Sequence, residues 1–215
     1  MSSQRHRVLL VDDHPIVRRG LRQLFDDEPG FEVCGEAEDA AAAFAEADRL
    51  RPDLAVVDLS LKGTSGIELT RQLHAYYPAM PVLVLSLHDE RLYAERALRA
   101  GASGYVMKSR SDDEILRAAR QVLGGGTYLS EAVQARRDAP HADPASPVEQ
   151  LSNREFEVFR LIGQGFAPRH IAERLHLSVS TVEVYRQHLK EKLNVPSAAL
   201  LRRYAIEWLR EHEGP

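Results

Sequence analysis

The sequence predicts an α/β domain built on a parallel sheet, followed by a smaller domain made only of helices. Two observations lead to this prediction. In residues 1–124, short apolar runs alternate with stretches that have helix signals, a pattern typical of parallel strands joined by helical crossovers. In residues 151–209 no strand-like runs occur, and every segment has the spacing of a helix. The 215 residues are enough for each domain to bury its own core.

Five short apolar runs in the first part are the expected strands. Runs of this length that lie between helical stretches indicate strands buried on both faces of a sheet. They span residues 8–12, 31–35, 54–58, 81–86 and 104–107. The expected helices span residues 15–25, 40–50, 66–77, 91–100 and 112–123. Pro15 suits the first turn of a helix, and Gly101 suits a helix C-terminus with a positive φ.

Residues 125–150 are expected to be a linker between domains 1–124 and 151–215. The segment follows Gly124 and contains Pro140, Pro144 and Pro147 among small polar residues. This composition opposes regular structure, although some order is expected near residues 127–134. The second domain begins with Ser152 and Glu155, which form a capping box. Its later helices are expected at residues 168–175, 180–193 and 197–209, which makes four in all.

Composition limits the classes of function. Residues 1–130 carry 16 basic and 20 acidic side chains, whereas residues 151–210 carry 10 basic and 6 acidic ones. The difference favours a polyanionic partner for the second domain only. Cys34 is the only cysteine, which excludes an internal disulfide and a cysteine metal cluster. The sequence has no apolar run long enough for a membrane span and no signal peptide at its start, so we expect a cytoplasmic protein without a membrane partner.

Polar residues end the first, third, fourth and fifth expected strands. Asp12 and Asp13 follow the first, Asp58 ends the third, Ser86 ends the fourth and Lys108 follows the fifth. Carboxyl ends of parallel strands meet at one edge of the sheet, where ligands bind. Three carboxylates could hold Mg²⁺, one of them could accept a phosphoryl group, and Lys108 could neutralise its charge. Any one acid could be only a polar strand end, but the complete set favours a site.

These residues resemble the receiver domain of bacterial two-component response regulators, a flavodoxin-like (βα)₅ fold with a five-stranded parallel sheet. The resemblance implies that Asp58 is the phospho-acceptor and that Asp12, Asp13 and Asp58 bind Mg²⁺. Lys108 would contact the phosphoryl group. Ser86 and Tyr105 would form a switch pair, in which the hydroxyl moves to the phosphate and the ring follows inward.

In the second domain, residues 168–175 and 180–193 predict a helix-turn-helix. Val182, Tyr185, Leu189 and Leu193 recur on one face of the second helix and should be buried. The opposite face carries Glu183, Val184 and Gln187, whose side chains can contact base edges in the major groove. The candidate DNA contacts are Arg169, Ser180, Thr181, Glu183, Val184, Gln187 and Lys190.

Residues 151–205 resemble the LuxR-type DNA-binding domain, and the whole layout resembles the NarL/FixJ class of regulators. The resemblance rests on Ile171-Ala172, Leu175, Leu177-Ser178, Thr181-Val182 and Lys192-Leu193. It implies that Glu183, Val184 and Gln187 read bases. It also implies that the last helix pairs two domains, so that two recognition helices lie about 34 Å apart on DNA.

We therefore interpret the chain as a phosphorylation-controlled transcription regulator and not an enzyme. A sensor histidine kinase would phosphorylate Asp58, and the modified protein would favour a homodimer that binds double-stranded DNA, with RNA polymerase as a further candidate partner. One alternative is a constitutive DNA-binding regulator with a phosphorylation-independent receiver. Another is an aspartyl-phosphate phosphatase, which usually has an acid two positions after the nucleophile, where this chain has Ser60.

Overall fold

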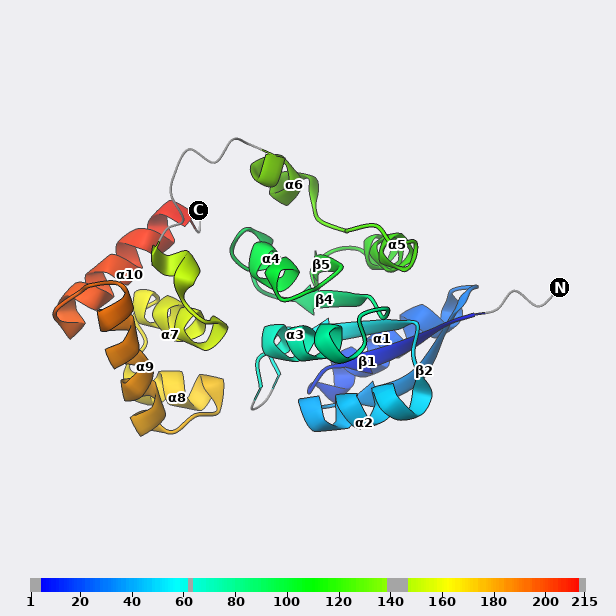
Figure 1. Ribbon diagram of the computed structural model, residues 1–215, viewed down its shortest axis with the longest axis horizontal. Coiled ribbons are helices and arrows are strands. Elements are labelled where there is room, and N and C mark those ends of the chain that lie inside the picture. Colours follow the sequence, from blue (N-terminus) through cyan, green and yellow to red (C-terminus); the bar gives the residue numbers. More distant parts are fainter. Residues whose placement is uncertain (1–4, 62–63, 139–146, 213–215) are drawn as a thin grey trace. The chain divides into compact units, whose positions relative to one another are not determined.

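The chain forms two compact units, Met1–Asp138 and Ala139–Pro215, which the ribbon of Figure 1 colours from blue to green and from yellow to red. The structure is a computed structural model that describes residues 5–61, 64–138 and 147–212. After the resemblance described above, we call Met1–Asp138 the receiver unit, and we call Ala139–Pro215 the helical unit. Among the described residues, we find no helix with the length and hydropathy needed to cross a bilayer.

The receiver unit contains the predicted parallel sheet. Its strands are β1 (His6–Val11), β2 (Phe31–Ala37), β3 (Leu54–Asp58), β4 (Val82–Ser86) and β5 (Gly104–Met107). They lie in the order β2-β1-β3-β4-β5, and neighbouring strands are parallel. The prediction of a five-stranded parallel sheet is confirmed. This order places β1, β3 and β4 side by side, so the residues that follow them lie at one edge.

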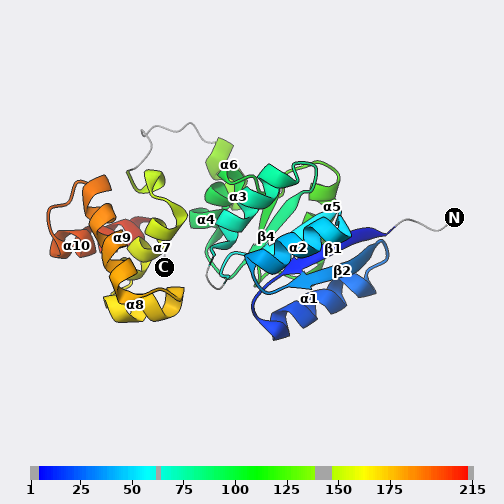
Figure 2. The same ribbon diagram turned by 60° about the horizontal axis from the view of Figure 1, so that its bottom comes forward.

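Helices cover both faces of this sheet. They are α1 (Pro15–Asp27), α2 (Ala40–Leu50), α3 (Gly66–Tyr76), α4 (Glu90–Arg99) and α5 (Asp112–Leu123). Successive strand residues point to opposite faces: Val8 and Leu10 belong to the same core cluster as residues of α1 and α5, whereas Leu9 and Val11 belong to the cluster that includes α2 and α3. Figure 2 shows α1 and α2 on opposite sides of the sheet.

The segment expected to be a linker, residues 125–150, contains two short helices. Helix α6 (Glu131–Asp138) belongs to the receiver unit, and the short 3₁₀ helix η1 (Pro147–Gln150) belongs to the helical unit. Pro140 and Pro144 lie outside the described residues. The receiver unit thus continues beyond α5, and its last helix, α6, contacts α4.

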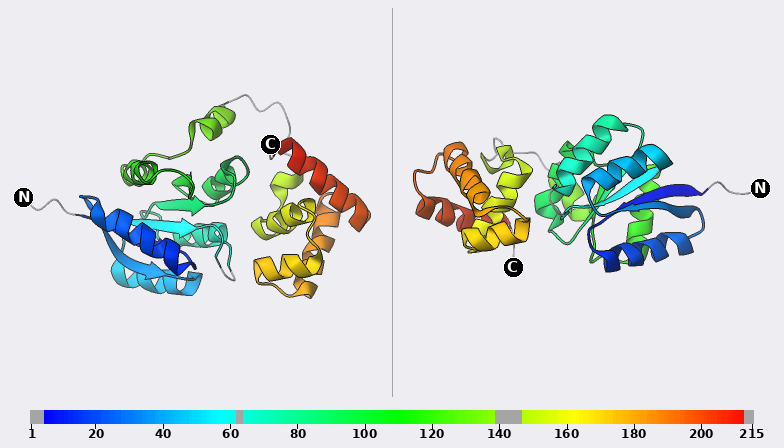
Figure 3. Two further views of the ribbon diagram at one scale, coloured as in Figure 1. Left: turned by 180° about the vertical axis from the view of Figure 1, so that it is seen from behind. Right: turned by 90° about the horizontal axis from the view of Figure 1, so that it is seen from below.

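The helical unit consists of α7 (Asn153–Gly163), α8 (Pro168–Leu175), α9 (Val179–Lys192) and α10 (Ala198–His212), preceded by η1, and the prediction of an all-helical second domain is confirmed. The capping box forms at Ser152 and Glu155. A Cβ at Gly163 would lie 2.7 Å from the carbonyl oxygen of Ala205, so a glycine lets α7 approach α10 closely (Figure 3).

Candidate functional site

Three acidic side chains lie together at the carboxyl edge of the sheet. Asp12 and Asp13 follow β1, and Asp58 is the last residue of the neighbouring strand β3. Their exposed fractions are only 1%, 8% and 4%. Together with His14, each offers one potential ligand atom, and these four atoms lie within 4.8 Å of one another. The fold therefore concentrates negative charge where little solvent reaches it.

Lys108 contributes the positive charge of this cluster. Its Nζ lies 2.6 Å from Oδ2 of Asp12 and 3.0 Å from Oδ2 of Asp58. The backbone N–H of Lys108 donates to the carbonyl of Ser86 at 2.7 Å, which fixes the start of the β5–α5 loop against the end of β4. The side chains that sequence reasoning placed at four strand ends thus belong to adjoining strand ends in the fold.

The Lys108 ammonium is shared between two buried carboxylates, so it compensates the charge of Asp58 only in part. Burial raises the pKa of Asp58, and the neighbouring charge of Asp12 adds to this effect, whereas Lys108 opposes it. A cation bound among the carboxylates would relieve their repulsion. The donors are hard oxygens close to one another, which fits the ligand preference of Mg²⁺. Asp12, Asp13 and Asp58 are the residues that could hold it.

His14 is both the N-cap residue of α1 and a neighbour of the acidic cluster. Its backbone N–H donates to Oδ1 of Asp12 at 2.7 Å, and its Nδ1 lies 2.8 Å from Oδ1 of Asp13. The ring is 62% exposed, so it lies at the mouth of the cluster.

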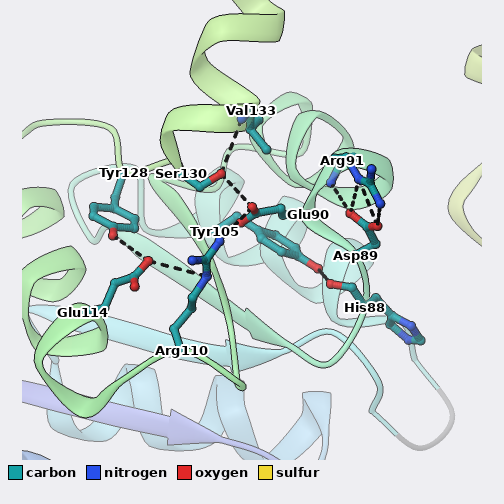
Figure 4. A network of polar contacts seen from close by, with 10 residues as sticks. All are labelled: His88, Asp89, Glu90, Arg91, Tyr105, Arg110, Glu114, Tyr128, Ser130 and Val133. Carbon is teal, nitrogen blue, oxygen red and sulfur yellow. Dashed lines mark hydrogen bonds and ion pairs between the residues drawn. The ribbon is translucent and has the colours of Figure 1, made fainter. Parts of the chain in front are cut away.

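Ser86 on β4 and Tyr105 on β5 both contact the backbone of His88. Ser86 is fully buried, and its Oγ accepts a hydrogen bond from the N–H of His88 at 3.0 Å. The Tyr105 hydroxyl donates to the carbonyl oxygen of His88 at 2.9 Å (Figure 4). Burial raises the pKa of Tyr105. The resemblance implies that the Tyr105 ring moves inward on phosphorylation. In this structure the residue is already buried, with 1% of its surface exposed.

Sequence reasoning missed the role of His88 in this region. Its Nε2 lies 3.0 Å from Oγ of Ser60, so it joins the β4–α4 loop to the β3–α3 loop next to Asp58. Its ring also stacks on Tyr93, with ring centroids 4.9 Å apart. A single loop histidine carries no spacing signal, and the contact depends on the fold of two loops.

In the helical unit, α8 and α9 are joined by a tight turn at His176, which has a φ of 53°. The predicted apolar stripe of α9 is buried at Val182, Leu189 and Leu193 and half-buried at Tyr185. On the remaining surface, the exposed candidates are Arg169, Ser180, Glu183, Val184 and Gln187, and the half-buried ones are Thr181 and Lys190.

Two of the candidate base-reading side chains are oriented by neighbours on α9. Arg186 donates to Oε1 of Glu183 at 2.6 Å, and Gln187 donates to Oε1 of Glu191 at 2.6 Å. Val184 lies between them in sequence and is 53% exposed. A polar helix face with one apolar side chain can contact base edges and the thymine methyl in a major groove.

Comparison with known proteins assigns a family to each unit. Residues 8–120 match the family described as response regulator receiver domain, and residues 149–205 match the family described as bacterial regulatory proteins, luxR family. The chain is 33% identical over 210 residues to the oxygen regulatory protein NreC of Staphylococcus haemolyticus. The matched region covers 94% of this chain and 97% of that protein.

Solved structures of RcsB are also similar to this chain. RcsB from Salmonella enterica serovar Typhimurium, bound to promoter rprA in the presence of the phosphomimetic BeF₃⁻, is 26% identical with a TM-score of 0.63. A structure of two RcsB dimers bound to two parallel DNAs is 26% identical with a TM-score of 0.58. Each comparison covers 94% of this chain and 98% of that one.

Proposed function

The chain belongs to the two-component response regulators that carry a LuxR-type DNA-binding domain, and from that premise we propose that phosphorylation of Asp58 controls its binding to DNA. Members of this family regulate transcription and are not enzymes. In this proposal residues 1–124 act as the receiver domain, residues 151–215 bind DNA and residues 125–150 connect them.

The contact between Asp58 and Lys108 is the observation that carries the proposal. Asp58 is buried among carboxylates that could hold Mg²⁺, and its Oδ2 lies 3.0 Å from a lysine ammonium. In the proposed reaction this carboxylate attacks the phosphorus of a phosphohistidine on a sensor kinase. An O–P bond forms, the P–N bond breaks, and the imidazole leaves with the electron pair. Bound Mg²⁺ would neutralise phosphoryl charge, as phosphoryl transfer requires.

Lys108 and Ser86 would hold the product. The ammonium already reaches Asp58 and would contact a phosphoryl oxygen attached to it. Ser86 is the last residue of the neighbouring strand β4. Its hydroxyl can donate to another phosphoryl oxygen once it turns away from the N–H of His88. A phosphoryl group on Asp58 adds a charge of about −1.5 to −2 to this cluster. Lys108 and Ser86 would both move to contact it.

For DNA binding, we propose that α9 enters the major groove and that two copies bind as a homodimer. Glu183, Val184 and Gln187 would read bases, whereas Arg169, Ser180, Thr181 and Lys190 would contact the backbone. RcsB, which is similar over both units, binds DNA as dimers. RNA polymerase is a candidate partner at the promoter.

The test measures phosphorylation and DNA affinity in the same protein samples. Asp58→Ala should abolish Mg²⁺-dependent labelling by acetyl phosphate carrying ³²P, because the acceptor oxygen is gone. It should also remove the increase in DNA affinity that the phospho-donor gives to the natural protein, which we expect to be about 5–150-fold. Asp48→Ala is the matched control, because Asp48 is an exposed acid of α2 paired with Arg51.

Two outcomes would contradict the proposal. Unchanged labelling of Asp58→Ala would remove Asp58 as the acceptor. Equal DNA affinity of the labelled and unlabelled natural protein would instead favour a constitutive DNA-binding regulator whose receiver does not depend on phosphorylation.

A further inference from the structure

The chain that follows α5 is built into the edge of the receiver sheet. Tyr128 forms a parallel bridge with Gly104 of β5. Its N–H donates to the carbonyl of Ser103 at 3.0 Å, and its own carbonyl accepts from the N–H of Tyr105 at 3.0 Å. A Cβ at Gly104 would lie 3.1 Å from the Tyr128 carbonyl oxygen, so a side chain there would crowd this approach. Residues just beyond α5 therefore bond directly to the strand that carries Tyr105.

Helix α6, which comes next, is anchored on α4. Oγ of Ser130, the residue before α6, donates to Oε1 of Glu90 at 2.7 Å. The same Oγ accepts from the N–H of Val133 at 3.3 Å, and the Val133 side chain is only 3% exposed. Glu90 is the first residue of α4. One carboxylate thus holds the start of α6 against the start of α4 (Figure 4).

The same carboxylate also holds the β5–α5 loop. Arg110 lies 3.1 Å from Oε1 of Glu90 and 3.7 Å from Oε1 of Glu114. The Tyr128 hydroxyl donates to that oxygen of Glu114 at 3.1 Å. We call these five residues, Glu90, Arg110, Glu114, Tyr128 and Ser130, the Glu90 cluster. Glu90 is 8% exposed, so its contacts are largely shielded from water.

Both loops that meet in the Glu90 cluster begin near Asp58, one after Ser86 at the end of the strand next to β3 and the other at Lys108. Glu90 lies two positions after His88, whose N–H donates to Ser86 and whose carbonyl accepts from Tyr105. Arg110 lies two positions after Lys108, which contacts Asp58 at 3.0 Å. A phosphoryl group that draws in Ser86 and Lys108 would therefore displace both ends of the contact between Glu90 and Arg110.

We propose that the Glu90 cluster is a latch that holds α6 on α4 and opens when Asp58 is phosphorylated. The inference rests on the proposed function. Hydrogen bonds weaken steeply with distance and angle, so a small shift of either loop breaks the 2.7 Å contact between Ser130 and Glu90. Release of α6 would detach its eight residues from the rest of the receiver unit.

Hydrogen exchange of the full-length protein, followed by mass spectrometry, tests the latch. In the natural protein, Mg²⁺ with beryllofluoride, a phosphoryl mimic, should speed exchange of the α6 amides about tenfold, the factor expected for loss of one hydrogen bond to a charged group. Glu90→Ala should show the fast exchange without beryllofluoride and no further increase with it. Glu95→Ala is the matched control: it removes an acid of the same helix that pairs with Arg99 on the exposed side, and should behave like the natural protein.

Ser130→Ala is a second variant that leaves the pair of Glu90 and Arg110 intact. It should also lose the response of α6 to beryllofluoride, while β1 and β3 keep their slow exchange. The latch is overturned if α6 in Glu90→Ala still responds, or if α6 of the natural protein is unchanged while the β4–α4 loop responds. Absence of any response in the receiver unit would instead overturn the proposed phosphorylation of Asp58, and the latch with it.

Discussion

The receiver unit and the helical unit each bury an acidic side chain in contact with a lysine, yet the two contacts differ in their surroundings. In the receiver unit, Lys108 contacts both Asp58 and Asp12, and Asp13 lies beside them. In the helical unit, Lys192 contacts only Glu155 among the described carboxylates, at 2.7 Å. Asp58 and Asp12 thus share one lysine, whereas among the described residues Glu155 has a lysine to itself, so we call the second contact balanced.

The pKa values shift in opposite directions as a result. Burial raises the pKa of Asp58, and the neighbouring carboxylate adds to the rise. Burial also acts to raise the pKa of Glu155, but hydrogen bonds from Lys192 and Ser152 outweigh it, and the pKa is lowered. Folding therefore favours the charged form of Glu155 and disfavours that of Asp58. The direction of the pKa shift thus distinguishes a carboxylate that stabilises the fold, such as Glu155, from one that is ready to bind a cation or a phosphoryl group, such as Asp58.

The largest expected effect on stability concerns the balanced contact. Glu155→Ala removes the hydrogen bond that the Glu155 carboxylate accepts in the capping box of α7, and also the contact with Lys192 on α9. We expect the free energy of unfolding of the helical unit to fall by about 2 kcal/mol, the sum expected for a cap and a charged hydrogen bond. Urea unfolding followed by the fluorescence of Trp208, the only tryptophan, reports on this unit alone.

Glu173→Ala is the control for this measurement. Glu173 belongs to α8, is 61% exposed and lies 3.5 Å from Arg169, so its loss should cost well under 1 kcal/mol. Equal losses in the two variants would mean that the Glu155 contact is no more than a surface ion pair, and the comparison between the units would fail.

The next effect concerns Mg²⁺, which should stabilise only the receiver unit. At a free concentration ten times its dissociation constant, a ligand that binds only the folded state adds about 1.4 kcal/mol. Hydrogen exchange of β1 and β3 should slow accordingly on addition of Mg²⁺, whereas that of α7 and α9 should not change. Asp13→Ala should lose most of the response. Slower exchange in both units would show binding that does not depend on the acidic cluster.

These contrasts also show what the sequence could predict. The strands, the parallel sheet and the all-helical second domain follow from apolar periodicity, which burial imposes on the sequence directly. Asp12, Asp58 and Lys108 were found because strand ends in a parallel sheet share an edge, so position in the chain is enough to bring them together. Their roles as acceptor, metal ligand and phosphate contact remain predictions.

The remaining contacts could not be predicted, because they join side chains from loops and segments far apart in sequence. Ser130 and Glu90 are 40 positions apart, and His88 reaches Ser60 across two loops. The composition of residues 125–150 predicts a linker, but burial of Tyr128 and Val133 gives its first part a place on the receiver unit. Such contacts depend on surfaces that exist only after the sheet has formed.

A smaller effect should appear when one negative charge is removed from the crowded cluster. Asp58→Asn should raise the free energy of unfolding of the receiver unit in the absence of Mg²⁺, because burial and the charge of Asp12 disfavour the ionised form of Asp58 in the folded state. The gain is expected because Lys108 still contacts Asp12 at 2.6 Å, while the repulsion between Asp58 and Asp12 disappears. Urea unfolding measured by far-ultraviolet circular dichroism, with Asp48→Asn as an exposed control, checks the sign. A loss of stability would mean that the cluster is balanced after all.

The smallest effect is the pH dependence of the balanced contact, and Glu155→Gln isolates it because glutamine can keep the capping box. The pKa of Glu155 is lowered by folding, so its contribution is complete above the ordinary carboxyl pKa of about 4.5 and disappears as the pH falls through the lowered value. His188→Gln is introduced into both proteins, because that ring lies 3.8 Å from Oε1 of Glu155 and would titrate as well. The difference in unfolding free energy between the two proteins, followed by Trp208 fluorescence, should be constant from pH 7 to about 5.5 and should shrink below about pH 4.5. A difference that grows on acidification would require a raised pKa at Glu155, which would place this carboxylate in the same class as Asp58 and remove the contrast between the two units.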